Sequence, residues 1–400
     1  MRCALLQLLL ASAWLGAAGP RGLAAQPVPL GPEVRVDTLL GDQYPNAPVL
    51  AVQPGGDFEI AWDYQGRIPL EIDSRHFAAD GEPTDASQVL IASLGNSATI
   101  AATATPRGFD VLWVKTHGPF QTFYRNHLNL HGLPDPGKPV PLGGAGADWV
   151  WNVRGNGFMA GWVRTGVPGI AARRLTSSGQ MTGPVLPLSS RPLEVGPLDP
   201  VIVFAVADGG FVAVWEGGVQ GSAGRVVVRA RRFSPAGKPL GPDFDINTFT
   251  AGTGPPPSDF TVAADPSGGF AVAWILSNTL YVRFFDASAK PLGPAVAAGT
   301  LENALSPESM AFDRAGNLLV LCLVSDDSVP PQTNLQIQLL DPHGLPMGPP
   351  ESVGSAASSH YPQPFQGSVA WAGDSWLITW AARDPQNVTS AIFVGRFAPR

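Results

Sequence analysis

Cysteine is almost absent from this sequence of 400 residues, which contains only Cys3 and Cys322. Cys3 lies in residues 1–25, where a basic residue, an apolar core and a run of small residues follow one another as in a secretory signal peptide. Removal of this signal would leave Cys322 alone, which excludes an intrachain disulfide bond from the mature chain. Because Cys322 stands inside an apolar run, residues 318–323, we interpret it as a buried and inert thiol rather than a reactive nucleophile.

Clusters of basic residues are also missing. The chain has 25 lysines and arginines against 32 aspartates and glutamates, a net charge of −7 that becomes −9 when Arg2 and Arg21 leave with the signal. An acidic chain without a basic patch argues against nucleic acid and anionic membrane surfaces as partners. No apolar run after residue 25 approaches the roughly 20 residues that a membrane-spanning helix needs. We therefore expect an exported protein without a membrane span, periplasmic or extracellular.

Catalytic and metal-binding motifs are missing as well. The sequence has no nucleophile elbow, phosphate-binding loop, cysteine-rich metal spacing or Ser/His/Asp signature. His127 and His131 are four residues apart, a spacing that pairs side chains on a helix but not at the strand end where we place them. Asp326 and Asp327 form a lone acidic pair without the further oxygen ligands that calcium needs. The sequence thus predicts no catalytic residue, no cofactor and no metal site.

Glycine and proline are frequent instead, at 46 and 41 residues, while 44% of the chain is hydrophobic. This composition is typical of short strands joined by tight turns. In the clearest unit, residues 201–207 and 211–215 are apolar on both faces, 225–233 are mixed, and 243–247 alternate between apolar and polar. Four strands that are buried at one end and solvated at the other predict a β-propeller blade, because a sandwich would give every strand one polar face.

One short signature recurs along the chain: an aromatic residue or leucine followed four residues later by tryptophan, or once by cysteine. Its seven occurrences are Phe58/Trp62, Phe109/Trp113, Phe158/Trp162, Phe211/Trp215, Phe270/Trp274, Leu318/Cys322 and Trp376/Trp380. Their spacing predicts an all-β, seven-bladed β-propeller of four-stranded antiparallel blades. We expect a single domain over residues 26–400, with blades at approximately 46–92, 97–143, 147–188, 200–247, 259–298, 308–354 and 367–400.

The two ends of the chain complement each other. The last unit stops at residues 397–400 without a fourth strand, and the segment Pro29–Asp37 copies Pro239–Asn247, which is a fourth strand without its first three. We therefore expect residues 31–39 to form the outer strand of the last blade. Such closure fixes the ends of a ring and removes an exposed strand edge.

The unit GGFVAVW (209–215) with RARRFSPAGKPLGPDFDIN (229–247) resembles the repeats of exported bacterial proteins that carry GGFVVVW…QRFDAAGxPxGxEFxVN units, a largely uncharacterised group. The resemblance covers nearly the whole mature chain and is strongest in the fourth and fifth units. It implies an exported β-propeller and carries over no catalytic residue or metal site.

Five residues are candidates for the face that carries the connections between blades. Asp63 and Glu216 directly follow the signature tryptophan at a position that is otherwise apolar. As a glycosidase pair they would need to lie roughly 5–10 Å apart, which blades one and four do not allow easily, so we interpret them as solvated starts of loops. Trp149 and Trp151 alternate on the strand nearest the central channel and either stack against sugars or pack between blades. Tyr361 lies in a polar loop before the last unit.

Three hypotheses for the function remain open. The leading one is an exported, monomeric, non-enzymatic binding or interaction module that presents the loops of one propeller face to a carbohydrate or protein ligand. The alternative is a secreted carbohydrate-active hydrolase or lyase, which requires acidic residues that converge near the axis. The third is a structural cell-surface protein. The propeller fold does not choose among them.

Overall fold

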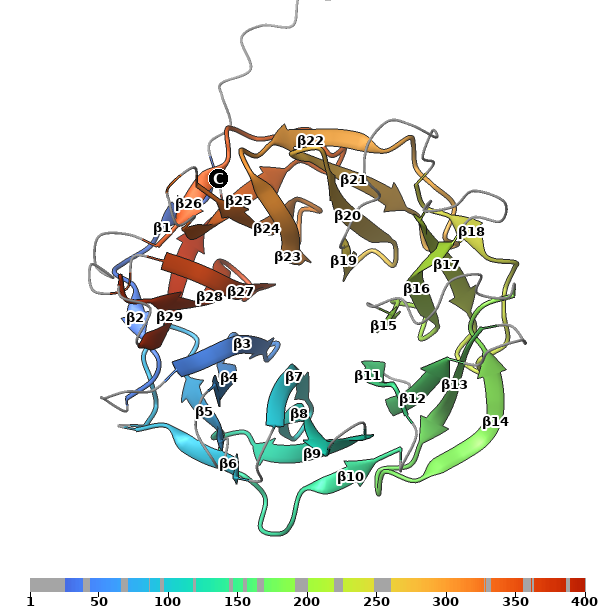
Figure 1. Cartoon of the computed structure of the whole chain (residues 1–400), viewed down its shortest axis with the longest axis horizontal. Coiled ribbons are helices and arrows are strands. Elements are labelled where there is room, and N and C mark those ends of the chain that lie inside the picture. Colours follow the sequence, from blue (N-terminus) through green and yellow to red (C-terminus); the bar gives the residue numbers. More distant parts are fainter. Residues whose placement is uncertain are drawn as a thin grey trace, which may run out of the picture.

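The computed structural model describes residues 26–399 apart from a set of short segments (Figure 1). The residues outside the description are 1–25, 39–43, 66–70, 86, 94–96, 118–119, 144–146, 154–156, 164–168, 191–200, 219–225, 248–259, 327, 329–331, 355–360, 362, 386–388 and 400. The expected signal peptide therefore lies outside the described residues. In the part of the chain that is described, no helix has the length and apolar character needed to cross a bilayer.

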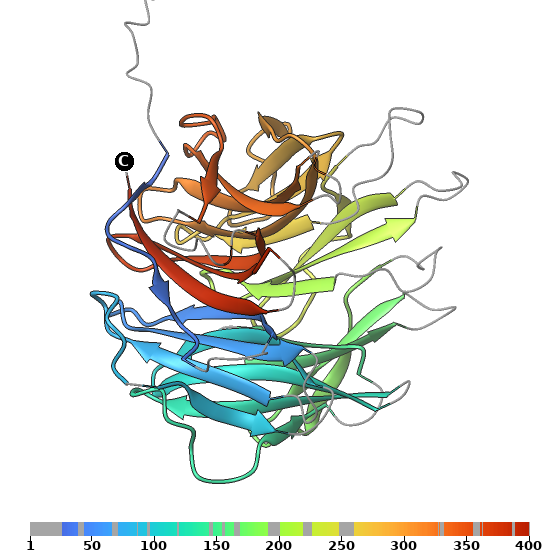
Figure 2. The same cartoon turned by 60° about the vertical axis from the view of Figure 1, so that its left-hand side comes forward.

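Seven antiparallel blades, each with four strand positions, stand around a central axis (Figures 1 and 2). Blade one contains β3 (Tyr44–Val52), β4 (Phe58–Gln65), β5 (Glu71–Phe77) and β6 (Val89–Ser93), and blade two contains β7 (Ser97–Thr105), β8 (Gly108–His117), β9 (Phe120–Asn129) and β10 (Val140–Leu142). Blade three contains β11 (Trp149–Val153), β12 (Gly157–Val163), β13 (Ile170–Leu175) and β14 (Met181–Pro187), and blade four contains β15 (Val201–Ala205), β16 (Phe211–Gly218), β17 (Val226–Phe233) and β18 (Phe244–Asp245). Blade five contains β19 (Phe260–Ala264), β20 (Phe270–Leu276), β21 (Thr279–Phe285) and β22 (Val296–Thr300), blade six contains β23 (Ala304–Phe312), β24 (Leu318–Ser325), β25 (Thr333–Leu340) and β26 (Glu351–Val353), and blade seven contains β27 (Gln363–Trp371), β28 (Trp376–Arg383) and β29 (Ser390–Ala398). The predicted seven-bladed β-propeller is confirmed.

The hydrophobic core lies between neighbouring blades. The aromatic residue that opens the signature stacks on a ring of the third strand of its own blade, in the pairs Phe58–Phe77, Phe211–Phe233 and Phe270–Phe285, whose centroids are 4.9, 4.7 and 4.6 Å apart. Successive residues of a second strand point to opposite faces, so alternate side chains pack on the preceding blade and on the following blade. Second strands are therefore buried on both faces, which explains why their sequence is apolar throughout.

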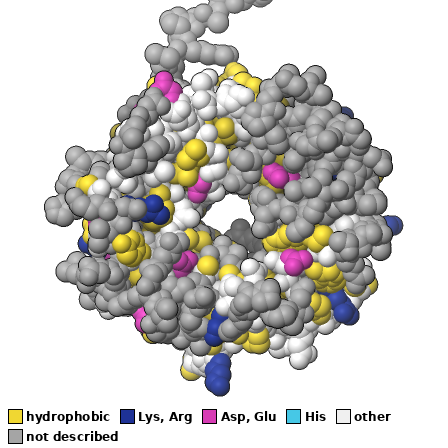
Figure 3. All heavy atoms as spheres, viewed as in Figure 1, with side chains coloured by type: hydrophobic (Ala, Val, Ile, Leu, Met, Phe, Trp, Pro, Cys, Tyr) yellow, Lys and Arg dark blue, Asp and Glu magenta, His cyan; other side chains and the backbone are white. Residues whose placement is uncertain are grey.

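The first strand of blade four, β15, is less buried than its apolar sequence predicts. In β15, Val201 and Val203 are buried, whereas Ile202 and Phe204 are half-buried. The first strand is the innermost strand of each blade and borders the opening at the centre of the ring (Figures 1 and 3). Side chains at this free edge are covered on fewer sides. The apolar sequence of β15 therefore predicts more burial than the structure shows.

The N-terminal segment completes blade seven. Strands β1 (Val28–Pro29) and β2 (Val34–Arg35) both pair antiparallel with β29, on the edge opposite β28. The predicted closure of the ring by the N-terminal strand is confirmed.

The hydrogen bonds of this segment repeat those of the outer strand of blade four. The N–H of Val36 donates to the carbonyl of Ile392 at 2.8 Å, and the Oδ1 atom of Asp37 accepts the N–H of Ile392 at 2.7 Å. In blade four, Asn247 stands at the position of Asp37, and its Oδ1 atom accepts the N–H of Val228 at 2.9 Å. The sequence match between the two segments therefore corresponds to matched backbone contacts.

Arginines of the third strands tie neighbouring blades together. One set donates to a carbonyl on the outer strand of the preceding blade: Arg75 to Val36, Arg231 to Pro187 and Arg283 to Ile246. A second set donates to a carbonyl in a turn of the following blade: Arg174 to Pro235, Arg232 to Ala287 and Arg396 to Asp80. The bonds of Arg75 and Arg396 both join blade seven to blade one, so the ring closes with the same contacts that hold the other junctions.

Cys322 occupies the position of the signature tryptophan in β24 and is fully buried. Burial raises the pKa of the Cys322 thiol, with a smaller contribution from the charge of Glu308, so the reactive thiolate is disfavoured in the folded protein. We expect iodoacetamide to leave native residues 26–400 unmodified and to add one label per chain after unfolding in urea. Intact-mass spectrometry measures both. Labelling of the native protein at the rate of a free thiol would contradict the expected burial.

Candidate functional site

Asp63 and Glu216 lie in β4 and β16, near the end of the second strand of their blades. Their exposed fractions are only 3% and 7%, so their interpretation as solvated residues is wrong. The reason is that both strands continue past them, to Gln65 and Gly218. The side chains are enclosed between blades instead of standing in a loop.

The two carboxylates face different junctions. Side chains alternate along a strand, so Asp63 shares a face with Ala61, which packs in the cluster between blades one and two. Glu216 shares a face with Val214, which packs in the cluster between blades four and five. The structure therefore does not bring these two residues together.

Trp149 and Trp151 stand on the same face of β11, with nearly parallel rings whose centroids are 6.1 Å apart. Both are half-buried and pack against the core between blades three and four. The Nε1 atom of Trp151 donates to the carbonyl of Val201 in blade four at 2.8 Å. Packing between blades accounts for Trp151.

Tyr361 packs against the core between blades six and seven. Its ring is tilted against Phe393 with centroids 6.1 Å apart, and the guanidinium carbon of Arg35 lies 5.5 Å from its ring centroid. Arg35 in turn pairs with Asp37 at 2.7 Å. Tyr361 thus contacts the segment that closes the ring, while its neighbour His360 lies outside the described residues.

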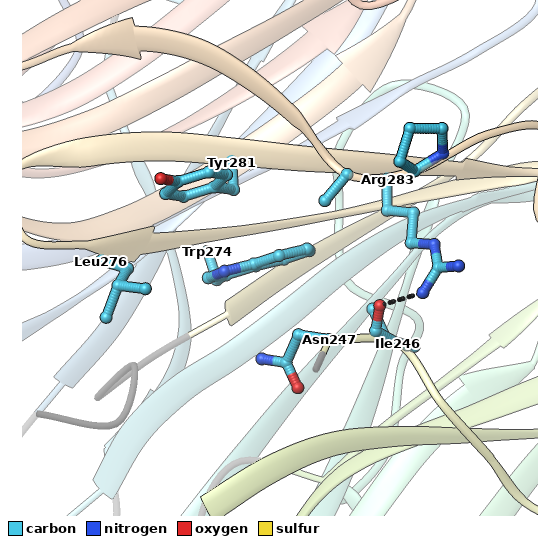
Figure 4. Close-up of a pocket in the computed structure, with 8 residues that line it drawn as sticks. Ile246, Asn247, Trp274, Leu276, Tyr281 and Arg283 are labelled. Atoms are coloured by element: carbon cyan, nitrogen blue, oxygen red, sulfur yellow. Dashed lines mark hydrogen bonds between the residues drawn. The ribbon is translucent and has the colours of Figure 1, made fainter. Parts of the chain in front are cut away.

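A cavity of about 320 Å³ lies between blades four and five, where β18 and β20 end (Figure 4). Its lining consists of Ile246, Asn247, Trp274, Leu276, Tyr281, Arg283, Pro294 and Ala295. Trp274 and Tyr281 are cross-strand partners, and their nearly parallel rings have centroids 6.0 Å apart. Ile246 and Asn247, which follow β18 of blade four, thus form one wall, and Tyr281 together with Trp274, which is only 3% exposed, forms the other.

A short hairpin positions the aromatic pair. Leu276 pairs with Thr279, which leaves only Ser277 and Asn278 in the turn, with φ angles of 49° and 63°. Positive φ at both central residues is the geometry of a type I′ turn, whose twist matches that of the flanking strands. The tight turn keeps the end of the hairpin in register and holds the two rings side by side.

The side chain of Asn247 lines the cavity. The residue is only 4% exposed, and its Oδ1 atom accepts the N–H of Val228. Its Nδ2 atom is buried and has no hydrogen-bond partner within the described part of the chain. Figure 4 shows the amide beside Trp274, on the side away from Tyr281. A buried donor without a partner costs about 1–3 kcal/mol, so this atom is able to donate a hydrogen bond to a group that enters the cavity.

Arg283 closes the outer end of the cavity. Its Nε atom donates to the carbonyl of Gly293 at 3.3 Å. Its Nη1 atom donates to the carbonyl of Ile246 at 2.5 Å, as drawn in Figure 4. Its guanidinium carbon also lies 5.6 Å from the ring centroid of Phe285. These contacts fix the cation at the site, so it needs no reordering to meet a ligand.

A second cavity of about 410 Å³ lies between the same two blades, and Arg283 lines both. Its remaining walls include Leu240 and Phe244 of blade four and Lys290 of blade five. Most of its lining belongs to the turns that precede the outer strands. These turns lie at the end of the blades opposite to the connections between blades.

Reasoning from the sequence missed the cavity. It treated Trp274 as a packing residue of the signature and assigned no role to Asn247, Tyr281 or Ala295. A signal was present in the aligned units, because the position of Ala295 carries a larger polar residue, Asp243, in blade four. When one repeat has a small residue where another repeat has a larger one, space is left beside the small residue.

Comparison with known proteins identifies the fold and no family. No family model matches the chain, and no curated protein matches it. A protein of unknown function from Dyadobacter fermentans is similar in structure, with 12% identity, a TM-score of 0.52, and coverage of 92% of this chain and 99% of that one. Prolyl oligopeptidase B from Galerina marginata has a TM-score of 0.48 at 11% identity, over 90% of this chain and 51% of that one. An exo-1,5-alpha-L-arabinanase from a bovine ruminal metagenomic library has a TM-score of 0.35 at 10% identity, over 90% and 95%. The likeness to the Dyadobacter fermentans protein, at 12% identity, is one of fold.

Proposed function

We propose that the protein is an exported, non-enzymatic binding module that holds a carbohydrate ligand in the cavity between blades four and five. The observation that carries the proposal is the combination of the Trp274 and Tyr281 rings with the unpartnered Nδ2 atom of Asn247. Aromatic faces supply apolar contact area to a sugar ring, and a fixed amide donor orients one of its polar groups.

The size of the cavity supports a small ligand or one unit of a longer one. At about 320 Å³ it stands at the lower end of the roughly 300–1,000 Å³ that ligand sites usually occupy. A polysaccharide would place one residue in the cavity and run along the surface of the propeller with the rest.

The distribution of carboxylates favours binding over hydrolysis. Glycoside hydrolysis uses two carboxyl groups roughly 5–10 Å apart. None of the described residues that line the cavity is acidic, and the two carboxylates singled out from the sequence, Asp63 and Glu216, face different junctions. The lining of the cavity therefore does not supply the pair of carboxyl groups that a glycosidase needs.

A thermal-shift screen of residues 26–400 against neutral, acidic and N-acetylated oligosaccharides tests the proposal. A ligand that binds the native state raises the melting temperature with its concentration, so at least one glycan should give a saturable rise while unrelated peptides give none. Chromatography of the same mixtures should recover the glycan intact. Absence of a shift with every glycan, or steady cleavage of one, would contradict the proposed function.

A further inference from the structure

The repeat provides internal references for the cavity. In blade five, Tyr281 pairs with Ala297, so Ala295 comes two residues before the pair on the outer strand. In blade one, Asp73 pairs with Leu90, which places Gln88 at the same position. The same count places Asp243 there in blade four, because Arg229 pairs with Asp245. Three junctions can therefore be compared at one position that carries Gln88, Asp243 or Ala295.

At the junction of blades seven and one, a side chain of the protein fills this position. The Nε2 atom of Gln88 donates to the hydroxyl of Tyr64 at 2.6 Å and to the carboxylate of Asp73. Its Oε1 atom accepts the N–H of Thr38 at 2.8 Å. The carboxamide thus turns its oxygen toward the end of the preceding outer strand and its nitrogen toward the second and third strands of its own blade.

At the junction of blades three and four, a carboxylate fills the position. The Oδ1 atom of Asp243 accepts the N–H of Ser190 at 2.8 Å and lies 4.0 Å from the Nε atom of Arg231. Its oxygen again faces the end of the preceding outer strand. In both junctions a carbonyl-type oxygen meets a donor from the preceding blade.

At the junction of blades four and five, the same position carries Ala295, which ends at Cβ, is exposed and lines the cavity. The residue that corresponds to Thr38 and Ser190 is residue 248, which lies outside the described residues. Its neighbour Asn247 presents a buried Nδ2 atom that has no partner in the described part of the chain. On the nitrogen side, Leu276 and Tyr281 stand where blade one has Tyr64 and Asp73. The donor for an oxygen is present, but the carboxylate that bound the NH₂ group has been replaced by an aromatic side chain.

We infer that the cavity binds the acetyl group of an N-acetylated sugar. An acetamido group has the shape of the Gln88 carboxamide, with a carbonyl oxygen for the Nδ2 atom of Asn247 and a methyl group, in place of the NH₂ group, for Leu276. This inference rests on the proposed function and specifies the class of carbohydrate.

Two substitutions test the assignment, each copied from another junction of the same protein. Ala295→Gln inserts the side chain that fills the position in blade one and should occupy the cavity. Asn247→Asp removes the Nδ2 donor and keeps the oxygen that accepts the N–H of Val228. Asp37 of blade seven accepts the N–H of Ile392 in the same way. Ala315→Gln, an equal substitution at an exposed turn residue of blade six, serves as the control.

The measurement is isothermal titration of chains comprising residues 26–400 with chitotriose, which carries acetamido groups, and with cellotriose, which has the same linkage without them. Chitotriose should bind, and cellotriose should bind at least about tenfold more weakly, because it lacks the carbonyl that pairs with the buried donor. Ala295→Gln and Asn247→Asp should each weaken chitotriose binding by about tenfold or more, while Ala315→Gln should not change it. Melting curves confirm that each variant is folded.

The outcomes separate the inference from the proposed function. Equal affinity for both trisaccharides, lost in Ala295→Gln, would keep a carbohydrate site in the cavity and overturn the acetyl assignment. Unchanged chitotriose binding in both cavity variants would place the ligand elsewhere and overturn the inference. Absence of binding by any oligosaccharide of the thermal-shift screen would overturn both.

Discussion

Deletion of residues 26–37 is expected to lower the free energy of unfolding by at least about 4 kcal/mol, from the lost burial of Val36 and the lost hydrogen bonds of this segment. Val36 is fully buried, and Asp37 caps the N–H of Ile392. The deletion also removes the Val36 carbonyl that accepts from Nη1 of Arg75 and exposes the outer edge of β29. Loss of one short segment therefore removes buried apolar contact and several hydrogen bonds at once.

Urea unfolding of residues 26–400 and 38–400, followed by tryptophan fluorescence, measures this effect. Added in trans, a peptide of residues 26–37 should restore stability in a concentration-dependent way, because it binds the native ring and not the unfolded chain. A peptide in which Val36→Asp places a charge at the buried position serves as the control. Equal unfolding midpoints for the two chains would show that the N-terminal strand does not close the ring.

Trp215→Ala is expected to destabilise the protein by about 3–5 kcal/mol, because it removes a large side chain from a packed core and leaves a cavity. Trp215 is 1% exposed and lies at the core between blades three and four. The equivalent residue of blade six is Cys322, where truncation to alanine removes only a sulfur atom. We expect Cys322→Ala to cost about 1 kcal/mol, near the average for a single substitution.

Chemical unfolding of the two variants beside the parent chain measures both costs, with Ala315→Gln as a surface control. The comparison holds the structural position constant and changes the volume of the side chain that is removed. Similar losses for Trp215→Ala and Cys322→Ala would mean that the signature position does not contribute to stability through the volume it fills.

The fold could be predicted from the sequence because its rules are local and repeated. Tight turns, two apolar strands and a solvated outer strand recur, and every copy that shares this order supports the others. The closure followed from one match, Pro29–Asp37 with Pro239–Asn247, because a strand sequence without its blade needs an edge to pair with. The partial exposure of Ile202 and Phe204 was not predicted, since apolar character does not reveal a free edge.

The candidate site could not be predicted in the same way, because it depends on residues from two blades. Asn247 is buried between two blades, and its Nδ2 atom has no hydrogen-bond partner among the described residues. Neither the burial of Asn247 nor the partners of its Nδ2 atom can be predicted from the sequence of a single strand. Asp63 and Glu216 misled for a related reason: a carboxylate after an apolar strand suggests a loop, whereas the strands extend past both residues and the next blade covers them.

A crystal structure of residues 26–400 soaked with chitotriose would show whether the cavity holds an N-acetylated sugar. We expect one sugar unit in the cavity between blades four and five, its ring against Trp274 or Tyr281 and its acetyl oxygen within hydrogen-bond distance of the Nδ2 atom of Asn247. A trisaccharide bound beside Trp149 or in the central channel, with the cavity left empty, would contradict it.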